Sequence, residues 1–177
     1  MPHSELISVS LSVTFHELDF KENMDITVTK AGIDDVEKIL QLQYAAYQSE
    51  ARIHNDFTIQ PLTQTLEESI TEYHKCVVLK AVSGGAIVGS VRAHVVGNTV
   101  YIGKLMVLPD QQGKGLGKRL LTAIEAEFPQ KRYELFTACK SSRNIHLYES
   151  SGYTRFHEET NGAGIAFAYM EKDGCIY

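Results

Sequence analysis

The first part of the chain alternates strictly between apolar and polar residues. This period of two is typical of a strand with one buried face. The apolar positions are Ile7, Val9, Leu11, Val13 and Phe15. A polar stretch follows, and residues 25–31 then predict a second strand. We therefore expect residues 1–23 to form an N-terminal extension with an extra strand, which would pair with a sheet edge or with a second subunit.

After Asp34 the apolar residues recur at helical spacing instead of alternating. Asp34 is predicted to cap this helix, because Glu37 follows it three residues later. The apolar positions of that helix are Val36, Ile39, Leu40, Tyr44 and Tyr47. We expect it to end near Glu50. Residues 52–62 are polar and aromatic and predict a loop, and residues 63–73 predict a second helix. Such a helix, loop and helix would form either one wall of a substrate cleft or a plain connection.

Three apolar runs separated by short glycine-containing turns come next. They predict consecutive antiparallel strands over residues 76–82, 86–96 and 99–108. A helix over residues 116–128 and a strand over residues 133–139 follow. Because a helix connects them, the strands before and after it are expected to be parallel neighbours.

The C-terminal part predicts a short helix that Ser141 or Ser142 caps and Gly152 ends. A hairpin of residues 153–158 and 165–171 closes the chain. The whole pattern predicts an α/β (α+β) fold with a mixed, mostly antiparallel sheet of about seven strands. Since no repeat or linker divides it, we expect residues 24–177 to form a single domain.

The charge balance narrows the class of partner. The 177 residues include 17 basic and 22 acidic side chains, which argues against a nucleic-acid-binding protein and favours a neutral or cationic substrate. Cys76, Cys139 and Cys175 have neither the spacing of a disulfide framework nor that of a zinc site, so no metal is expected. No run reaches the roughly 18 apolar residues of a membrane span. Without a secretory signal at the N-terminus, we expect a cytoplasmic protein that binds no membrane.

Candidate chemistry first appears where the strand over residues 99–108 ends. Pro109 breaks the strand, and Gly113, Gly115 and Gly117 lead directly into the next helix. Glycines let the backbone approach a ligand closely, and the first N–H groups of a helix are unpaired and attract anions. The basic residues around this loop are Lys114, Lys118 and Arg119. The segment predicts a phosphate site, the alternative being a glycine-rich connection without a ligand.

The glycine spacing excludes two nucleotide-binding loops. A Walker loop needs Ser or Thr after Gly-Lys, but Arg119 follows Gly117 and Lys118, and Gln112 stands where its first glycine would be. A dinucleotide-binding loop needs its third glycine one residue later than Gly117. What remains is Gln-x-x-Gly-x-Gly at residues 112–117.

A second motif lies in the short helix, where residues 147–153 read Leu-Tyr-x-x-x-Gly-Tyr and Asn144 precedes Tyr148 by one helical turn. Together with the glycine loop and the strand order, this motif resembles the GCN5-related N-acetyltransferase (GNAT) superfamily. Members of that superfamily transfer acetyl groups from acetyl-coenzyme A to amines. The resemblance covers residues 25–172.

The resemblance implies a GNAT-like twisted sheet that is splayed open between its fourth and fifth core strands, with about four helices on its faces. It implies acetyl-coenzyme A (acetyl-CoA) as co-substrate, with the pantetheine arm in the opening and the pyrophosphate on backbone N–H groups of residues 113–118. The implied cofactor-binding residues are Leu105, Met106, Val107, Gln112, Gly113, Lys114, Gly115, Leu116, Gly117, Lys118, Asn144 and Tyr148. This chain departs from many members in having Ser141, not asparagine, seven residues before the tyrosine.

The chemistry of acetyl transfer suggests roles for individual residues. An amine that attacks a thioester expels a thiolate, which needs an acid near the sulfur. Tyr148 is the candidate acid, because a phenol with a pKa of about 10 stays protonated at neutral pH; the alternative is a structural tyrosine. The amine needs a base, but residues 101–108 contain no Asp or Glu. Glu50, His94 and a water chain are therefore the candidates.

We predict an N-acetyltransferase that acts on a primary amine of a small molecule or peptide by direct attack. It would be a homodimer if the extension pairs with a second subunit. A non-catalytic module that senses acyl-coenzyme A is the alternative, and the failed Walker spacing argues against a nucleotide triphosphate binder.

Overall fold

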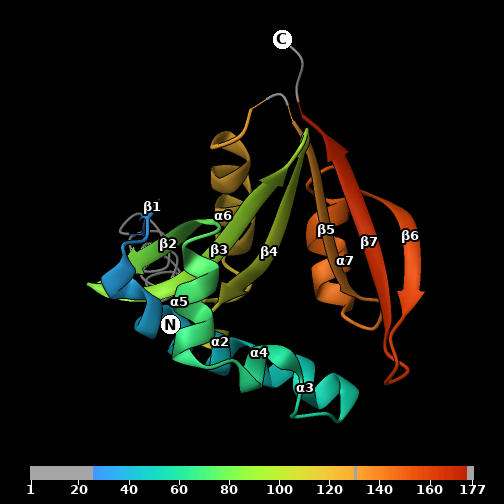
Figure 1. The fold of residues 1–177 in the computed structure, drawn as a ribbon, viewed down its shortest axis with the longest axis horizontal. Coiled ribbons are helices and arrows are strands. Elements are labelled where there is room, and N and C mark those ends of the chain that lie inside the picture. The colour runs from blue at the N-terminus through green and yellow to red at the C-terminus, as the bar shows by residue number, and fades with distance from the viewer. Residues whose placement is uncertain (1–25, 130, 175–177) are drawn as a thin grey trace, which may run out of the picture.

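The computed structural model describes residues 26–129 and 131–174, so the predicted N-terminal strand lies outside the described residues. Within them the chain forms a seven-stranded sheet with the order β1-β2-β3-β4-β5-β7-β6 (Figure 1). Neighbouring strands are antiparallel except β4 and β5, which are parallel. The strands are β1 (Thr27–Lys30), β2 (Val77–Ser83), β3 (Ala86–Val96), β4 (Thr99–Val107), β5 (Arg132–Ala138), β6 (Thr154–Thr160) and β7 (Ala166–Asp173). This arrangement confirms the predicted mixed, mostly antiparallel sheet.

The helices are η1 (Ile33–Asp35), α2 (Val36–Ala46), α3 (Gln48–His54), α4 (Gln60–Thr63), α5 (Leu66–Tyr73), η2 (Pro109–Gln111), α6 (Leu116–Ala126) and α7 (Ser142–Glu149). They follow the predicted segments with three corrections. The N-cap of α2 is Asp35 and not the predicted Asp34, which lies within η1. The first predicted helix breaks at Tyr47 and continues as α3 to Asn55, whose left-handed backbone (φ 50°) ends it. The predicted loop over residues 52–62 contains the end of α3 and the start of α4. Pro61 lies in the first turn of α4, where its missing N–H leaves no helical hydrogen bond unmade.

The two faces of the sheet carry different helices. α6 and α7 pack on one face, where the predicted apolar stripe of α6 is buried against the central strands. Its members Leu116, Leu120, Leu121 and Ile124 are each at most 1% exposed. α2 and α5 cover the other face beside β3 and β4. The short helices α3 and α4 extend α2 into a row along one end of the sheet (Figure 1).

β4 and β5 are joined along only part of their length. Their pairing is limited to residues 99–101 of β4 and residues 132–134 of β5. Beyond these residues the two strands diverge into a V that widens toward α3 (Figure 1). In the described chain, residues 102–107 and 135–138 therefore have no strand partner on the sides that face each other. The predicted splay between the fourth and fifth strands is confirmed.

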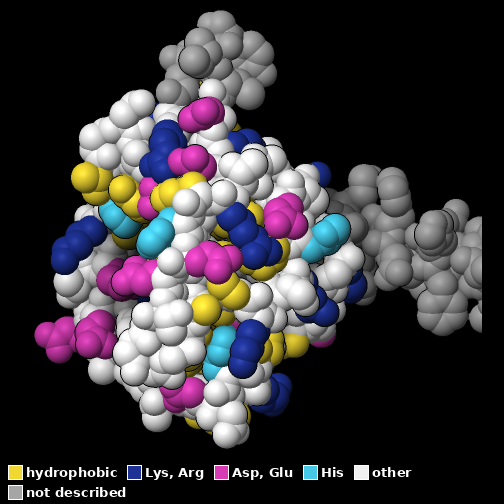
Figure 2. All heavy atoms as spheres, turned by 90° about the vertical axis from the view of Figure 1, so that its right-hand side faces the viewer, with side chains coloured by type: hydrophobic (Ala, Val, Ile, Leu, Met, Phe, Trp, Pro, Cys, Tyr) yellow, Lys and Arg dark blue, Asp and Glu magenta, His cyan; other side chains and the backbone are white. Residues whose placement is uncertain are grey.

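The C-terminal hairpin forms one edge of the sheet. Every residue of β6 is exposed, and the rings of Phe136 and Phe156 each contact Tyr169 on the hairpin face. Figure 2 shows basic, acidic and hydrophobic side chains interspersed on this side of the molecule. Among the described residues, no helix is long and apolar enough to cross a membrane. The same residues contain no group of three or more His, Cys, Asp and Glu side chains that could hold a metal ion.

Candidate active site

The open edge of β4 supplies backbone groups without a strand partner. Leu105, Met106 and Val107, the strand residues predicted to contact a cofactor, lie on this edge. A buried N–H or C=O group without a partner is unfavourable. Residues 102–107, together with residues 135–138 of β5 across the V, therefore favour a ligand that brings amide groups of its own.

A β-bulge interrupts the pairing of β4 with β3. Ser90 pairs with Met106 and Arg92 pairs with Gly103, so β4 has one residue more than β3 in this interval. Within the bulge, Lys104 has a left-handed backbone (φ 47°), which is uncommon for a residue with a side chain. A bulge of this kind bends the strand and changes the direction of the side chains that follow it.

The bulge reverses which residues of β4 face which side of the sheet. Before it, Val100 and Ile102 are buried in the core beneath α6. After it, Leu105 and Val107 pack on that core, whereas Met106 lines a cavity beneath α2 and α5. Since side chains alternate along a strand, a single extra residue is enough to exchange the two faces.

The glycine-rich loop joins η2 to α6 at the predicted position. Gly113 and Gly115 have φ angles of 79° and 80°, and Gly115 is the N-cap of α6 without a side-chain cap. A Cβ atom at either position would meet nothing within 4 Å, so the backbone conformation and not crowding requires glycine. A Cβ atom at Gly117 would lie 3.3 Å from Leu147 of α7, so the two helices approach closely there. The N-terminus of α6 is thus suited to an anion.

Gln112 connects this loop to its neighbours through both ends of its side-chain amide. Its Nε2 atom donates a hydrogen bond to the carbonyl oxygen of Val107 (3.0 Å). Its Oε1 atom accepts a hydrogen bond from Arg143 of α7. Both ends of the amide are therefore engaged, and Gln112 ties the loop to β4 and to α7.

Tyr148 of α7 is buried, and no described residue forms a hydrogen bond with its hydroxyl group. The neighbouring Tyr153, by contrast, donates to the carboxylate of Glu125 (2.8 Å). Burial raises the pKa of Tyr148, and the nearby Tyr47 and Glu50 raise it further. Tyr148 therefore stays protonated at neutral pH and has a proton to donate.

Glu50 connects α3 to α7 at the wide end of the V. Its carboxylate accepts hydrogen bonds from the Ser141 hydroxyl and from Asn144 Nδ2 (3.2 Å). Asn144 Nδ2 also lies 3.3 Å from the Thr137 hydroxyl oxygen on the open part of β5. Because Glu50 acts electrostatically on Tyr148, the structure brings one candidate base close to the candidate acid.

His94 does not belong to this group. It is exposed on β3 and stacks on Tyr101 with ring centroids 5.3 Å apart. Tyr101 lies in the part of β4 that is still paired with β5. From Tyr101 to Leu105 the strand advances by roughly 13 Å, so His94 lies toward the closed end of the V, away from Leu105 and Glu50, and we do not propose it as the base.

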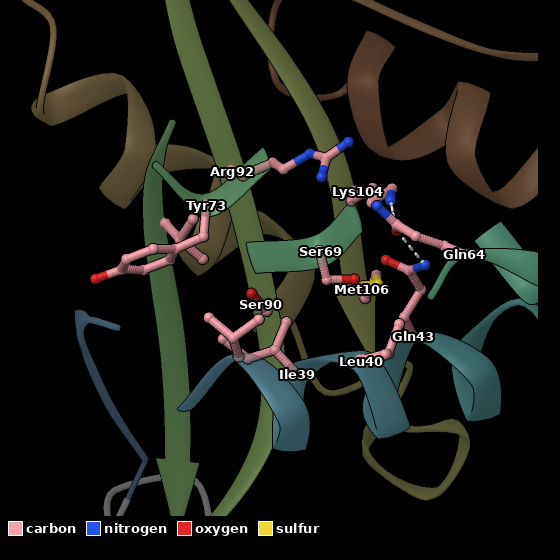
Figure 3. A pocket seen from close by; sticks show the side chains of 12 residues that line it. Ile39, Leu40, Gln43, Gln64, Ser69, Tyr73, Ser90, Arg92, Lys104 and Met106 are labelled. Carbon is pink, nitrogen blue, oxygen red and sulfur yellow. Dashed lines mark hydrogen bonds between the residues drawn. The ribbon is translucent and has the colours of Figure 1, made fainter. Parts of the chain in front are cut away.

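A half-buried ionic network lies beside the bulge, and Figure 3 shows its members Arg92, Lys104 and Gln64. Glu72 of α5 accepts two hydrogen bonds from the Arg92 guanidinium, one of them at 3.1 Å, and lies 3.2 Å from Lys104 Nζ. Gln64 is 2% exposed; it donates to Glu72 and accepts from Lys104 and from Gln43 (2.9 Å). Sequence reasoning missed these residues, because they come from separate elements and share no motif.

Burial and the neighbouring charges shift the pKa of both the acidic group and the lysine in this network. Burial alone would raise the pKa of Glu72, but hydrogen bonds from Arg92 and Gln64 and the two cationic charges lower it to about 2. Burial and the Arg92 charge lower the pKa of Lys104 to about 8, against the opposing effect of Glu72. At neutral pH Glu72 is ionised, and Lys104 loses its proton more easily than an ordinary lysine.

Comparison with known proteins agrees with this geometry. A family model described as an acetyltransferase (GNAT) domain matches residues 43–173. A putative acetyltransferase of Bacillus subtilis (strain 168) is 25% identical over 134 residues, which are 70% of this chain and 91% of that protein.

Solved structures share the fold at low sequence identity. The PaiA N-acetyltransferase of Thermoplasma acidophilum in complex with coenzyme A has a TM-score of 0.68 at 17% identity, over 84% of this chain and 98% of that one. The putative acetyltransferase YncA of Salmonella typhimurium with acetyl-CoA has a TM-score of 0.69 at 19% identity, over 86% and 95%. A phosphinothricin acetyltransferase of Sinorhizobium meliloti with acetyl-CoA has a TM-score of 0.67 at 17% identity, over 85% and 89%.

Proposed function

Because the chain belongs to the acetyltransferase (GNAT) family, we propose that it transfers an acetyl group from acetyl-CoA to a primary amine of a small molecule or peptide by direct attack. Membership of the family makes the protein an acyltransferase; the acceptor, the mechanism and the residue roles are our proposal. We assign them to residues 24–177 as a single catalytic domain. The observation that carries the mechanism is that the residue Tyr148 is buried while its hydroxyl group has no hydrogen-bond partner among the described residues.

The residues around the V fit acetyl-CoA, which supplies an activated acetyl thioester when bound. The N–H groups of residues 113–118 would hold its pyrophosphate at the start of α6, where Gly115 takes a left-handed conformation. Leu116 and Lys118 belong to the same helical turn. The edge of β4 at Leu105, Met106 and Val107 would hydrogen-bond the pantetheine arm, since β5 does not pair there.

Tyr148 is the proposed general acid. Its hydroxyl keeps its proton at neutral pH because burial raises its pKa. It lies on α7, which flanks the open part of β5, so it can give that proton to the departing thiolate sulfur. Tyr153, by contrast, donates its hydroxyl proton to Glu125, whereas the Tyr148 hydroxyl has no such partner among the described residues.

Glu50 is the proposed general base. A carboxylate that accepts hydrogen bonds from Ser141 and Asn144 is fixed in position and can take a proton from the acceptor's ammonium group, directly or through water, so that the free amine can attack. We therefore propose that Asn144 orients Glu50, and that Gln112 holds the glycine-rich loop in place.

Thiol release tests this function. The protein mixed with acetyl-CoA and a panel of amines should liberate free coenzyme A, and Tyr148→Phe should lower kcat by about a hundredfold or more. The matched control is Tyr169→Phe, because the Tyr169 hydroxyl donates a hydrogen bond to Glu159 on the exposed hairpin. Equal losses in both variants would refute the general-acid role. Stabilisation by acetyl-CoA without thiol release from any amine would favour a non-catalytic acyl-coenzyme A sensor.

A further inference from the structure

The network beside the bulge contains more positive than negative charge. Arg92 and Lys104 contribute two cations, and Glu72 contributes the carboxylate between them. Their side chains are 24%, 9% and 33% exposed, respectively. Solvent therefore screens this excess positive charge only in part, and an anion would be attracted to it.

The hydrogen-bond donors of the two cations are also in excess. A guanidinium has five N–H donors and an ammonium has three. Glu72 accepts two from Arg92 and one from Lys104, and Gln64 accepts another from Lys104. The other donors have no acceptor among the described residues. Because Lys104 is almost fully buried, a donor left without an acceptor there is unfavourable.

The backbone holds this excess of charge beside the proposed acetyl site. Lys104 owes its direction to the left-handed bulge, and it precedes Leu105 of the open edge. Strained backbone of this kind concentrates at functional sites. Beneath Lys104 and Arg92 lies a cavity of about 40 Å³ that α2 lines mainly with apolar side chains and α5 lines with Ser69 and Tyr73 (Figure 3). The cavity is large enough for a few water molecules, and the two cations stand among its polar walls.

A negative charge, that of Glu50, also acts on Tyr47. Burial raises the pKa of the Tyr47 hydroxyl to about 12; the Arg92 guanidinium opposes this rise, and the Glu50 and Glu72 carboxylates add to it. Tyr47 is therefore close enough for both charges to influence its pKa. An acceptor in this region would meet a carboxylate at Glu50 and a pair of cations at Arg92 and Lys104.

We infer that the acceptor is an amino acid, whose amine faces Glu50 and whose own carboxylate binds to Arg92 and Lys104. This inference rests on the proposed function and names its substrate class. Such a carboxylate would take the unused donors of both cations and balance the charge that Glu72 leaves unbalanced. The distance between amine and carboxylate in the substrate would have to match the spacing of the two charged sites.

A series of paired acceptors tests the inference in the unmodified protein. Glycine, β-alanine, γ-aminobutyrate and ε-aminocaproate carry a carboxylate at increasing distance from the amine; methylamine, ethylamine, propylamine and pentylamine are the same chains without it. L-α-amino acids are compared with their amides. At the matching spacing, kcat/KM from thiol release should favour the amino acid by about tenfold to a hundredfold.

Variants of the network then test whether Arg92 and Lys104 cause the preference for amino acids over amines. Arg92→Gln and, separately, Lys104→Gln should bring the ratio of amino acid to amine close to one. Arg132→Gln is the matched control, since Arg132 pairs with two carboxylates, Glu134 and Glu171, on β5 and β7 and so offers no excess charge. It should keep the full preference. Stabilisation by acetyl-CoA identifies the variants that fold.

The outcomes separate this inference from the proposed function. Equal rates for amines and amino acids, or faster rates for amines, would overturn the amino-acid assignment and leave the acetyltransferase intact. A preference that survives both Arg92→Gln and Lys104→Gln would overturn the assigned site. Absence of thiol release from every acceptor would count against the function and the inference together.

Discussion

Glu72 is the residue on which the charge balance of the network beside the bulge depends. It is the carboxylate in contact with both Arg92 and Lys104, and it also takes a hydrogen bond from Gln64. These contacts favour its ionised form strongly enough to overcome the effect of burial. Loss of that charge would leave two cations side by side in a half-buried site, which is unfavourable.

Acid should therefore destabilise the fold through Glu72. Its pKa in the folded protein is about 2, below the ordinary value of 4.5, so its stabilising effect is fully present above pH 4.5 and is lost as the pH falls toward 2. Glu72→Gln should lower the free energy of unfolding at neutral pH by about 1–3 kcal/mol. The free energy of unfolding of this variant should also decrease less steeply as the pH falls. Urea unfolding at several pH values measures both, and parallel pH curves for the two proteins would contradict this role.

The bulge and the glycine loop are the elements that shape the site, and they differ in how far sequence reveals them. Three alternating glycines before an apolar helix predict the loop, because positive φ angles favour glycine. Nothing local predicts the bulge, since Lys104 adopts φ 47° without being a residue that favours it. The sequence does not reveal the break at Tyr47 either, because the apolar spacing of α2 continues into α3.

Gly115 offers a direct test of the loop. With φ at 80° and open space around its Cβ position, Gly115→Ala adds backbone strain but no clash, and should lower the free energy of unfolding by about 1–2 kcal/mol. It should also weaken coenzyme A binding, because the strain falls at the N-terminus of α6. Gly162 has equal space and no positive φ, so Gly162→Ala should change stability by less than about 0.5 kcal/mol. Urea titration and calorimetric binding would disprove the idea if the two variants behaved alike.

At the scale of the whole molecule, the sheet consists of two parts that share few hydrogen bonds. β1 to β4 form one part and β5 to β7 the other, and only residues 99–101 and 132–134 pair between them. α6, packed against Leu147 of α7 through Gly117, provides a further connection. A ligand that lies in the V and bonds to both parts would join them.

Acetyl-CoA should therefore stabilise the protein in a localised way. At a hundredfold excess over Kd the gain is about 2.7 kcal/mol, or roughly 5–10 °C in Tm for a chain of this size. Amide hydrogen exchange should slow at residues 102–107 and 135–138. The nucleotide portion of coenzyme A without its pantetheine arm is the control, and it should leave exchange at these residues unchanged. Equal protection by both ligands would mean that the arm does not lie in the V.

Only the parts of the site that lie in short segments could be predicted from the sequence. Strand order, the glycine loop and the Tyr148 motif are written in short segments, so they were predictable. The contacts of Glu50 with Ser141 and Asn144 join residues about ninety positions apart. The contacts of Glu72 with Arg92 and Lys104 join α5 to two strands. Such pairings depend on the assembled fold, and no local period encodes them.

The extra residue in β4 also has an evolutionary consequence. Because it separates Leu105 and Val107, which pack beneath α6, from Lys104 and Met106, which face α5, substitutions on one set need not disturb the other. Under the proposed acceptor assignment, acceptor preference would change through the side chains of residues 104 and 106, while the core beneath α6 keeps its packing. An engineer who wants a new acceptor should randomise those two positions together with Arg92 and Glu72, and leave their neighbours on the strand alone.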